Sequence, residues 1–328
     1  MAELGTILAA QKNGLYVTYT SATTIAISAG SAVMNGVVYT FAAGSATFAD
    51  IDTGAEAAGT NYYVYALAAG GYKISVSASA PTGYTTSNSK LIGWFHNNPS
   101  NDISQYSVAS GTDVDYPERG PKPGMVMLPG AKWMIDIYIA SDLGGTGKAV
   151  HAGNAAASAY NATPWASLTA AGQMKACHNA GKRLCTNEEW SMAALGTPAG
   201  DDANTTCWTK ADNAASNPTG TLTGCVSTLG CYDMTGNVWE RVSTWYDNTD
   251  VAADQAGWDW ATAWTNEAEG GGAYTPFGNT AGPDALTGPR QWIRGGYWVD
   301  STSAGGWAAL GYDSPRYANS HIGFRCCA

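Results

Sequence analysis

The stretch Arg294-Gly-Gly-Tyr-Trp298, followed after a polar run by Ile322-Gly-Phe-Arg-Cys-Cys327, decides the expected fold. Between these two apolar and Gly-rich segments lie Asp, Ser, Gly, Tyr, Arg, Asn and His residues without a sustained helical or strand period. Such a run does not suit a core, because core positions of helices and strands recur periodically. A rigid scaffold that presents irregular polar and aromatic residues is typical of a binding surface. We therefore expect this end of the chain to be the functional one.

The composition indicates a β-rich or loop-rich globular protein. Its 328 residues allow two domains, and it has 40 Gly, 11% aromatic and only 13% charged residues. The formal net charge of −10 leaves no basic patch that could neutralise phosphates. Nucleic acid and anionic membranes are therefore not expected as partners.

The first residues, Met-Ala-Glu-Leu-Gly-Thr, lack the cationic and apolar regions of a signal peptide, and the chain has no run of eighteen uncharged apolar residues. We expect no signal peptide and no membrane insertion. The seven cysteines all lie in the second half and lack paired C-x-x-C spacing. An odd number leaves at least one thiol without an intramolecular partner. The sequence does not settle whether Cys207 pairs with Cys225 or Cys231, or whether any pair is oxidised; the cysteines are Cys177, Cys185, Cys207, Cys225, Cys231, Cys326 and Cys327.

Residues 1–105 are predicted to form consecutive short strands. Asn35-Gly36 accepts the two positive φ angles of a type I′ turn and predicts a hairpin with Val37–Phe41 as its second strand. Tyr62–Leu67 and Tyr72–Ser77 alternate with period two and predict another hairpin. This part carries no cysteine and few charges, so we expect an all-β sandwich or partial barrel without chemistry.

The same N-terminal part resembles modules of phage tail-fibre and baseplate-associated proteins. The residues that carry this resemblance are the Asn-Gly hairpin, the Tyr-Tyr-Val-Tyr strand and Ser79-Ala-Pro-Thr-Gly-Tyr84. The resemblance implies that this domain attaches the chain to a larger assembly.

Residues 106–123 are predicted to be a linker, because prolines and glycines interrupt any regular ladder there. The second domain is then predicted to span 124–328. Its paired strands are expected within 125–138, and a first helix is expected from Pro164 to Gly181, with Pro near its start and Gly past its end.

A second helix is indicated by a capping box, Thr186-Asn-Glu-Glu189. The Thr hydroxyl would accept the backbone N–H of the third helical residue, and the Glu carboxylate would accept the reverse bond. Gly196 is expected to close this helix.

Four separated motifs in the second domain resemble those of the formylglycine-generating-enzyme (sulfatase-modifying factor) superfamily. They are, in order, Gly124-Met-Val-Met-Leu-Pro-Gly130, Gly181-Lys-Arg-Leu-Cys-Thr-Asn-Glu-Glu-Trp190, Asp233-Met-Thr-Gly-Asn-Val-Trp-Glu240, and Arg294-Gly-Gly-Tyr-Trp298 with Ile322-Gly-Phe-Arg325. The resemblance implies an α+β C-type-lectin fold. Within that superfamily the C-terminus most resembles the variable proteins of diversity-generating retroelements, in which adenine-directed mutagenesis rewrites selected codons, many of them for Asn.

This resemblance makes a test within the sequence possible. Randomising the adenines of an Asn codon cannot produce Lys, Glu, Gln, Met or Trp, because its third base stays a pyrimidine. No Lys, Glu, Gln or Met occurs between Tyr297 and His321, and Trp298 and Trp307 should be scaffold positions. Tyr residues supply rigid amphipathic area and polar residues supply orientable hydrogen bonds. The predicted ligand-binding residues are Tyr297, Val299, Asp300, Ser303, Gly311, Tyr312, Asp313, Ser314, Arg316, Tyr317, Asn319 and His321.

The enzyme alternative is not favoured. Formylglycine-generating enzymes need two cysteines just after the R-G-G motif, and residues 297–306 contain none. Cys326 and Cys327 are expected to lie beyond the final strand of the domain. The four histidines are scattered and do not indicate the iron site of the related sulfoxide synthases.

No cofactor is required by these motifs, but the resemblance implies one structural metal site. In the superfamily, side-chain and main-chain oxygens of the D-x-x-G-N-V-W-E segment surround a calcium ion. Its ligands here would be Asp233, Gly236, Val238 and Glu240. The alternative is that the two carboxylates cap and pair within a buried turn, with Arg241 or Arg325 as partner.

We therefore expect a hypervariable receptor-binding protein that recognises a protein or glycan on a target cell surface. Its place would be a virion, as part of a tail fibre, or a cell surface, and a homotrimer would raise its avidity. A fixed-specificity lectin or adhesin of the same fold is the second interpretation. A formylglycine-generating-type enzyme is the third.

Overall fold

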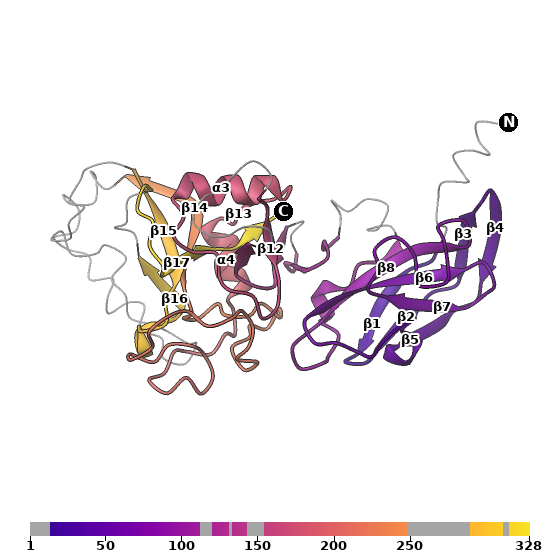
Figure 1. The fold of residues 1–328 in the computed structure, drawn as a ribbon, viewed down its shortest axis with the longest axis horizontal. Helices are drawn as coiled ribbons and strands as arrows, with labels where there is room; N and C mark the ends of the chain where they lie inside the picture. Colours follow the sequence, from indigo (N-terminus) through magenta and orange to yellow (C-terminus); the bar gives the residue numbers. More distant parts are fainter. Residues whose placement is uncertain (1–13, 112–119, 131–132, 143–153, 248–288, 311–314) are drawn as a thin grey trace. The chain divides into compact units, whose positions relative to one another are not determined.

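The computed structural model describes residues 14–111, 120–130, 133–142, 154–247, 289–310 and 315–328 (Figure 1). The chain divides into two compact units, residues 1–134 and 135–328. The described residues form mostly β-strands with few helices.

Within residues 14–111 of the first unit, eight strands form three sheets, two of three strands and one hairpin. Their orders are β1-β2-β5, β3-β4 and β7-β6-β8. The strands are β1 (Val17–Ser21), β2 (Thr24–Ile27), β3 (Gly30–Met34), β4 (Val37–Phe41), β5 (Gly44–Thr47), β6 (Thr60–Leu67), β7 (Tyr72–Ser75) and β8 (Ser89–Asn97), with 3₁₀ turns η1 (Phe48–Asp50) and η2 (Gln105–Ser107).

Both predicted hairpins are confirmed. Asn35 and Gly36 have φ angles of 49° and 74°, the two positive values of the predicted turn, and join β3 to β4 in register. β6 pairs with β7 on one side and with β8 on the other. The core of this unit gathers alternate residues from all these strands, and in it Tyr62 stacks on Phe95 with 5.7 Å between ring centroids.

The described strands from residue 125 onward form two four-stranded sheets and one two-stranded sheet, β11-β12. The sheet orders are β13-β18-β10-β9 and β16-β15-β14-β17. The strands are β9 (Met125–Met127), β10 (Met134–Asp136), β11 (Ala140–Asp142), β12 (Ala156–Ser158), β13 (Arg183–Leu184), β14 (Trp239–Asp247), β15 (Pro289–Gly295), β16 (Gly305–Leu310), β17 (Ile322–Phe324) and β18 (Cys326–Cys327). The predicted strands within 125–138 are thus confirmed as β9 and β10.

The expectation for the last two cysteines was wrong. They form β18, which lies inside a sheet between β13 and β10. Both are buried, and each is joined to a distant part of the chain, Cys326 to Cys177 and Cys327 to Cys185. Cys207 pairs with Cys225, which settles the alternative that the sequence left open and leaves Cys231 as the buried free thiol.

The first helix of the second unit begins later than predicted. α3 spans Ala170–Asn179, because Thr169 caps it by accepting the N–H of Gly172 at 3.3 Å. Ser167 has a φ of 62°, which no right-handed helix can contain, so Pro164 lies before the helix. Gly181 follows the helix end with a positive φ, as predicted.

The second helix, α4 (Asn187–Ala193), confirms the capping box. The amide of Glu189 donates to the Thr186 hydroxyl at 3.2 Å, and its carboxylate accepts the amide of Thr186 at 2.8 Å. Gly196, with a φ of 77°, follows this helix.

The boundaries between the parts stay predictions. The two compact units divide at residue 135, later than the predicted domain start at 124. Within the first unit, Ala109 of the predicted linker donates its N–H to the Trp94 carbonyl, and the Ser107 hydroxyl accepts the N–H of His96. The residues just after 105 therefore pack with the strands.

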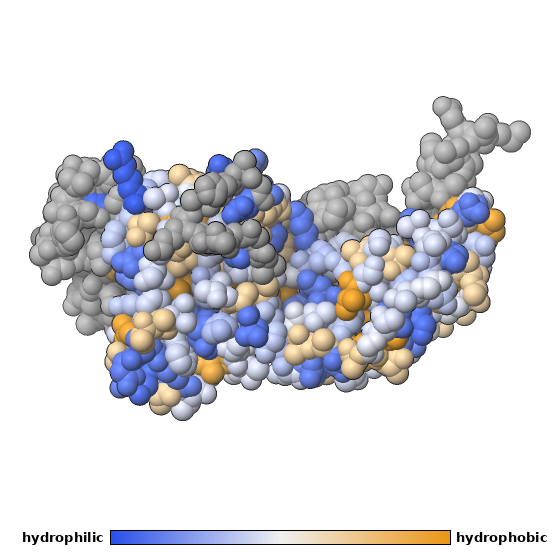
Figure 2. All heavy atoms as spheres, viewed as in Figure 1, coloured by the Kyte–Doolittle hydropathy of each residue, from blue (hydrophilic) through white to orange (hydrophobic). Residues whose placement is uncertain are grey.

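Across the described residues, no helix has both the length and the apolar character that a bilayer crossing requires. Figure 2 shows strongly hydrophobic residues only in small separate groups on the face that it draws.

Candidate functional site

The backbone of Trp298 is held from two sides. Its N–H donates to the carbonyl oxygen of Asn237 at 3.1 Å, and its carbonyl accepts the side-chain N–H of Asn213 at 2.8 Å. The ring is 8% exposed and packs on Ile139 and Val238. The contacts of Trp298 are therefore those of a scaffold residue, as the codon argument predicts.

The R-G-G turn brings the chain to this point. Gly295 and Gly296 have φ angles of 93° and 86°, which favour glycine. A Cβ atom on Gly296 would lie 2.6 Å from the Cβ of Ala304. The two glycines thus let the next residues fold back onto their own loop.

The turn that follows Trp298 is fixed mainly by main-chain hydrogen bonds. Ser301 donates its N–H to the Thr209 carbonyl at 2.7 Å, and Gly200 donates to the Ala304 carbonyl at 3.0 Å. The side chain of Asp300 takes part, because its Oδ2 accepts the N–H of Tyr297 at 2.9 Å. Asp300, predicted as a contact residue, is therefore also a turn residue.

Three predicted contact residues come together beside this turn. The rings of Tyr297 and His321 are 4.8 Å apart between centroids, and those of Tyr317 and His321 are 6.4 Å apart. All three are half-buried, and the two tyrosines pack against a cluster that includes Trp239 and Ile322. Burial raises the pKa of Tyr297 and lowers that of His321, so these two side chains are neutral at physiological pH.

The other predicted contact residues have different environments. Val299 is half-buried on the Trp298 side, Ser303 is half-buried in 3₁₀ turn η5 (Ser301–Ser303), and Arg316 is exposed. Asn319 donates from its side chain to the Tyr317 hydroxyl at 2.7 Å. Gly311, Tyr312, Asp313 and Ser314 lie outside the described residues.

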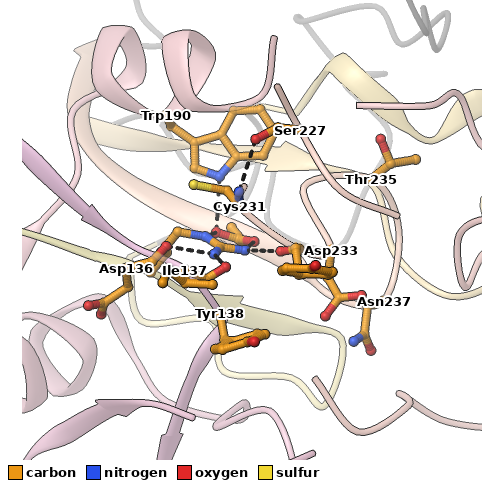
Figure 3. A network of polar contacts seen from close by, with 12 residues as sticks. Asp136, Ile137, Tyr138, Trp190, Ser227, Cys231, Asp233, Thr235 and Asn237 are labelled. Carbon is orange, nitrogen blue, oxygen red and sulfur yellow. Dashed lines mark hydrogen bonds and ion pairs between the residues drawn. The ribbon is translucent and has the colours of Figure 1, made fainter. Parts of the chain in front are cut away.

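Arg325 is buried and lies in a network of polar contacts, of which Figure 3 shows Asp136, Ile137 and Trp190 among others. The guanidinium donates to both carboxylate oxygens of Glu240, each at 3.0 Å, and to three backbone carbonyls. Those carbonyls belong to Asp136, Ile137 and Tyr232, at 2.8, 2.6 and 2.6 Å. Trp190 also donates its indole N–H to Glu240 at 3.0 Å. Such bidentate, fully bonded pairs fix side chains in one geometry.

The two carboxylates among the predicted calcium ligands already have hydrogen-bond partners in this arrangement. Both oxygens of Glu240 already bind Arg325, which is the alternative that the sequence analysis left open. Asp233 accepts the N–H of Gly220 at 2.6 Å, and burial raises its pKa to about 6. Gly236 donates its N–H to the Gly295 carbonyl, and Val238 packs in the core. Calcium binding stays a prediction. Calorimetric titration with Ca²⁺, after a chelator has removed metal from the protein, would measure it.

Loop 200–217 supports the site and was not predicted from the sequence. The side-chain oxygen of Asn204 accepts the backbone N–H groups of Thr209 and Lys210, both at 2.8 Å, and its NH₂ donates to Asn213 at 2.7 Å. The disulfide of Cys207 anchors the same loop. The sequence signal that could have indicated this loop is the pair of Asn residues, Asn204 and Asn213, that flank Cys207.

Residues 15–118 match the family model described as "Mtd second domain". The tail fiber receptor-binding protein of Bordetella phage BPP-1 is 26% identical over 349 residues, covering 96% of this chain and 82% of that protein. The solved structure of the Major Tropism Determinant P3c variant aligns with a TM-score of 0.65 and 21% identity, over 96% of this chain and 83% of the other. The chain has the fold of the major tropism determinants. These matches together confirm the predicted resemblance to variable proteins with a C-type-lectin fold.

The solved structure of the U1 variant of the major tropism determinant also aligns with this chain, with a TM-score of 0.65 and 22% identity, over 95% of this chain and 82% of the other. A further relative, the serine/threonine-protein kinase Pkn1 of Chlamydia trachomatis serovar L2, is 30% identical over 157 residues. That alignment covers 44% of this chain but only 21% of the kinase, so the name of the kinase carries no activity to this chain.

Proposed function

We propose that this chain is a receptor-binding protein of the tail-fibre type, which recognises its target through a face made of residues 297–303 and 315–321. The observation that carries the proposal is the way in which Trp298 is held. Its N–H and carbonyl bind Asn237 and Asn213. Both residues lie outside residues 297–303 and 315–321, which form the displayed segment. Side chains beside it can therefore be exchanged while the backbone keeps its path.

The chemistry of the face supports recognition rather than turnover. Tyr297, Tyr317 and His321 form a half-buried aromatic cluster, and the exposed Arg316 precedes Tyr317 in the chain. Aromatic residues and Arg are the types that most often dominate binding energy at interfaces.

The relatives support the same function. The protein of Bordetella phage BPP-1 is named a tail fiber receptor-binding protein, and we extend that role to this chain, on a virion and toward a receptor on a target cell. We further propose that the first unit is a β-sandwich or partial barrel that joins the chain to a larger assembly, and that the second has the formylglycine-generating-type variant of the lectin fold. Assembly as a homotrimer would suit multivalent attachment.

The enzyme alternative gains no support from the cysteines. Six of the seven are joined in disulfides, and burial raises the pKa of the remaining Cys231 thiol to about 12. A thiolate nucleophile would need the opposite shift.

The test is adsorption to target cells. A labelled chain carrying Tyr297→Ala, Arg316→Ala and Tyr317→Ala together should keep its melting temperature within a few degrees and lose cell binding. Retained binding with a folded protein would contradict the proposal. A near-identical template repeat in the neighbouring DNA, differing at adenines, separates a diversified face from a fixed-specificity adhesin.

A further inference from the structure

We propose that Trp208 is a fixed anchor of the ligand-binding face, which contacts a protein ligand together with the displayed residues. Trp208 lies on loop 200–217, outside the C-terminal segment. The inference rests on the proposed function and names a residue that the displayed segment does not contain.

The position of Trp208 places it on the same patch as the displayed residues. Its side chain is half-buried and packs on the buried cluster of Ile139, Val238 and Trp298. Tyr297 and Val299 pack on that same cluster. A ligand that covers those two side chains therefore lies over a surface that Trp208 shares.

The backbone around Trp208 is tied directly to the displayed turn. The carbonyl of Trp208 accepts the N–H of Asn237 at 2.9 Å, and the next carbonyl, of Thr209, accepts the N–H of Ser301 at 2.7 Å. The same Asn237 residue accepts the N–H of Trp298. Trp208 and the displayed turn thus keep one relative position.

The ring itself is held in one orientation. Its indole N–H donates to the carbonyl of Ala215 at 2.9 Å, and Asn204 and Asn213 bond to each other within the loop. The disulfide between Cys207 and Cys225 fixes the residue before it. A rigid aromatic side chain loses little entropy on binding, which is the property of an interface anchor.

A protein ligand fits this surface better than a glycan does. Trp, Tyr and Arg are the residues enriched at protein–protein hot spots. Here Trp208 and Tyr297 share their patch with the aliphatic Val299, so the patch offers apolar area more than hydrogen bonds. Variation of the neighbouring side chains would change which protein is bound, while Trp208 would supply a constant part of the affinity.

The experiment uses the full chain displayed on filamentous phage, which adds no N-glycan at Asn204-Thr-Thr206. Asp300 is not randomised, because its side chain bonds within the turn. The codons randomised are those for Tyr297, Val299, Ser303, Arg316, Tyr317, Asn319 and His321. The library is selected in parallel against lysozyme, which is an unglycosylated protein, and against mannan, which is a polysaccharide. Trp208→Ala is then introduced into several independent lysozyme-binding clones. The matched control is Trp245→Ala, which truncates an exposed Trp of the same unit, six residues and about 20 Å along β14 from Trp239.

We expect Trp208→Ala to weaken lysozyme binding at least tenfold in most clones, and Trp245→Ala to change it less than twofold. Unchanged affinity of folded Trp208→Ala variants in most clones would overturn the inference while leaving the proposed function intact. Enrichment on mannan alone would overturn the choice of a protein ligand. Failure to select any binder would overturn the proposed function, and the inference with it.

A second measurement covers the case in which Trp208→Ala lowers the melting temperature by more than about 5 °C. Hydroxyl-radical footprinting of the unsubstituted clones, with and without lysozyme, then decides. Trp208 should be protected severalfold by bound lysozyme and Trp245 should not. Equal labelling of Trp208 in both states would overturn the inference.

Discussion

The amide of Trp298 donates a hydrogen bond to the carbonyl oxygen of Asn237, and this bond joins the displayed segment to the D-M-T-G-N-V-W-E motif. Asn237 has a φ of 60° and uses its side chain as well, accepting the N–H of Asn217 at 3.0 Å and donating to its carbonyl at 3.1 Å. One residue thus connects the motif, loop 200–217 and the proposed binding face.

Asn237→Ala should lower the free energy of unfolding by about 2–4 kcal/mol, because it removes two buried hydrogen bonds and places Ala at a positive φ. Asn237→Gly tolerates that φ and should lose less than the Ala variant. Urea unfolding of the full chain measures both. If the two variants proved equally stable, strain at this position would have no part in the effect.

Asp300→Ala should lower the stability of the turn by about 1 kcal/mol, because the Tyr297 amide loses its acceptor, as in the loss of a helix cap. Asp300→Asn keeps an acceptor oxygen and should unfold like the unsubstituted chain. Hydrogen exchange of the Tyr297 amide gives the local readout. Slow exchange of this amide in the Ala variant would show that the bond contributes nothing.

Arg325→Met should cost about 3–5 kcal/mol, because it leaves the buried Glu240 carboxylate without its counter-charge. Arg325→Met combined with Glu240→Gln should recover part of that loss, since position 240 then no longer carries an uncompensated buried charge. Thermal unfolding of the single and double variants measures the difference. A double variant less stable than Arg325→Met would contradict this account.

The stability of the first unit should depend on His96. Burial lowers the pKa of this side chain from 6.5 to about 3, so the folded state favours the neutral ring. The contribution of the neutral His96 side chain to the free energy of unfolding is fully present above pH 6.5. It is lost as the pH falls toward the pKa of the folded state. Between about pH 6.5 and pH 5 the loss should reach about 2 kcal/mol.

The measurement for His96 is amide hydrogen exchange in β6 and β8 across this pH range. His96→Gln cannot titrate and should flatten the pH dependence, while retaining a polar group near Asn61, whose Oδ1 lies 2.8 Å from Nδ1 of His96. The same pH dependence in His96→Gln would assign the effect to another group.

Removing the disulfide between Cys185 and Cys327, by changing both to Ala, should cost about 2–5 kcal/mol. This bond joins residues 142 apart in sequence, so its loss frees the unfolded chain, and it also holds β18 beside β13. Guanidinium unfolding measures the loss. The matched control, Cys231→Ala, removes a thiol without a disulfide, and it should be clearly less destabilising than the pair.

Local features were predictable where the cause lies within a few residues. Asn35-Gly36 dictates its turn because only a few residue types accept a positive φ, and Thr186 with Glu189 dictates a helix start by reciprocal hydrogen bonds. The helix α3 begins later in the chain than the sequence predicted. Pro164 is compatible with the first turn of a helix, but tertiary contacts of the neighbouring residues prevent a helix from starting there. One such contact is the bond from the Trp165 amide to Ala140.

The sequence by itself determined the β-rich N-terminal part, the lectin-type motifs and the segment in which the binding residues are predicted, since these depend on residue order and local conformation. Only the tertiary structure decided which cysteines pair, that Glu240 faces Arg325, and that Trp208 shares a buried patch with Tyr297. Those relationships join residues far apart in the chain, and chain order alone does not specify which of them meet once the core is packed.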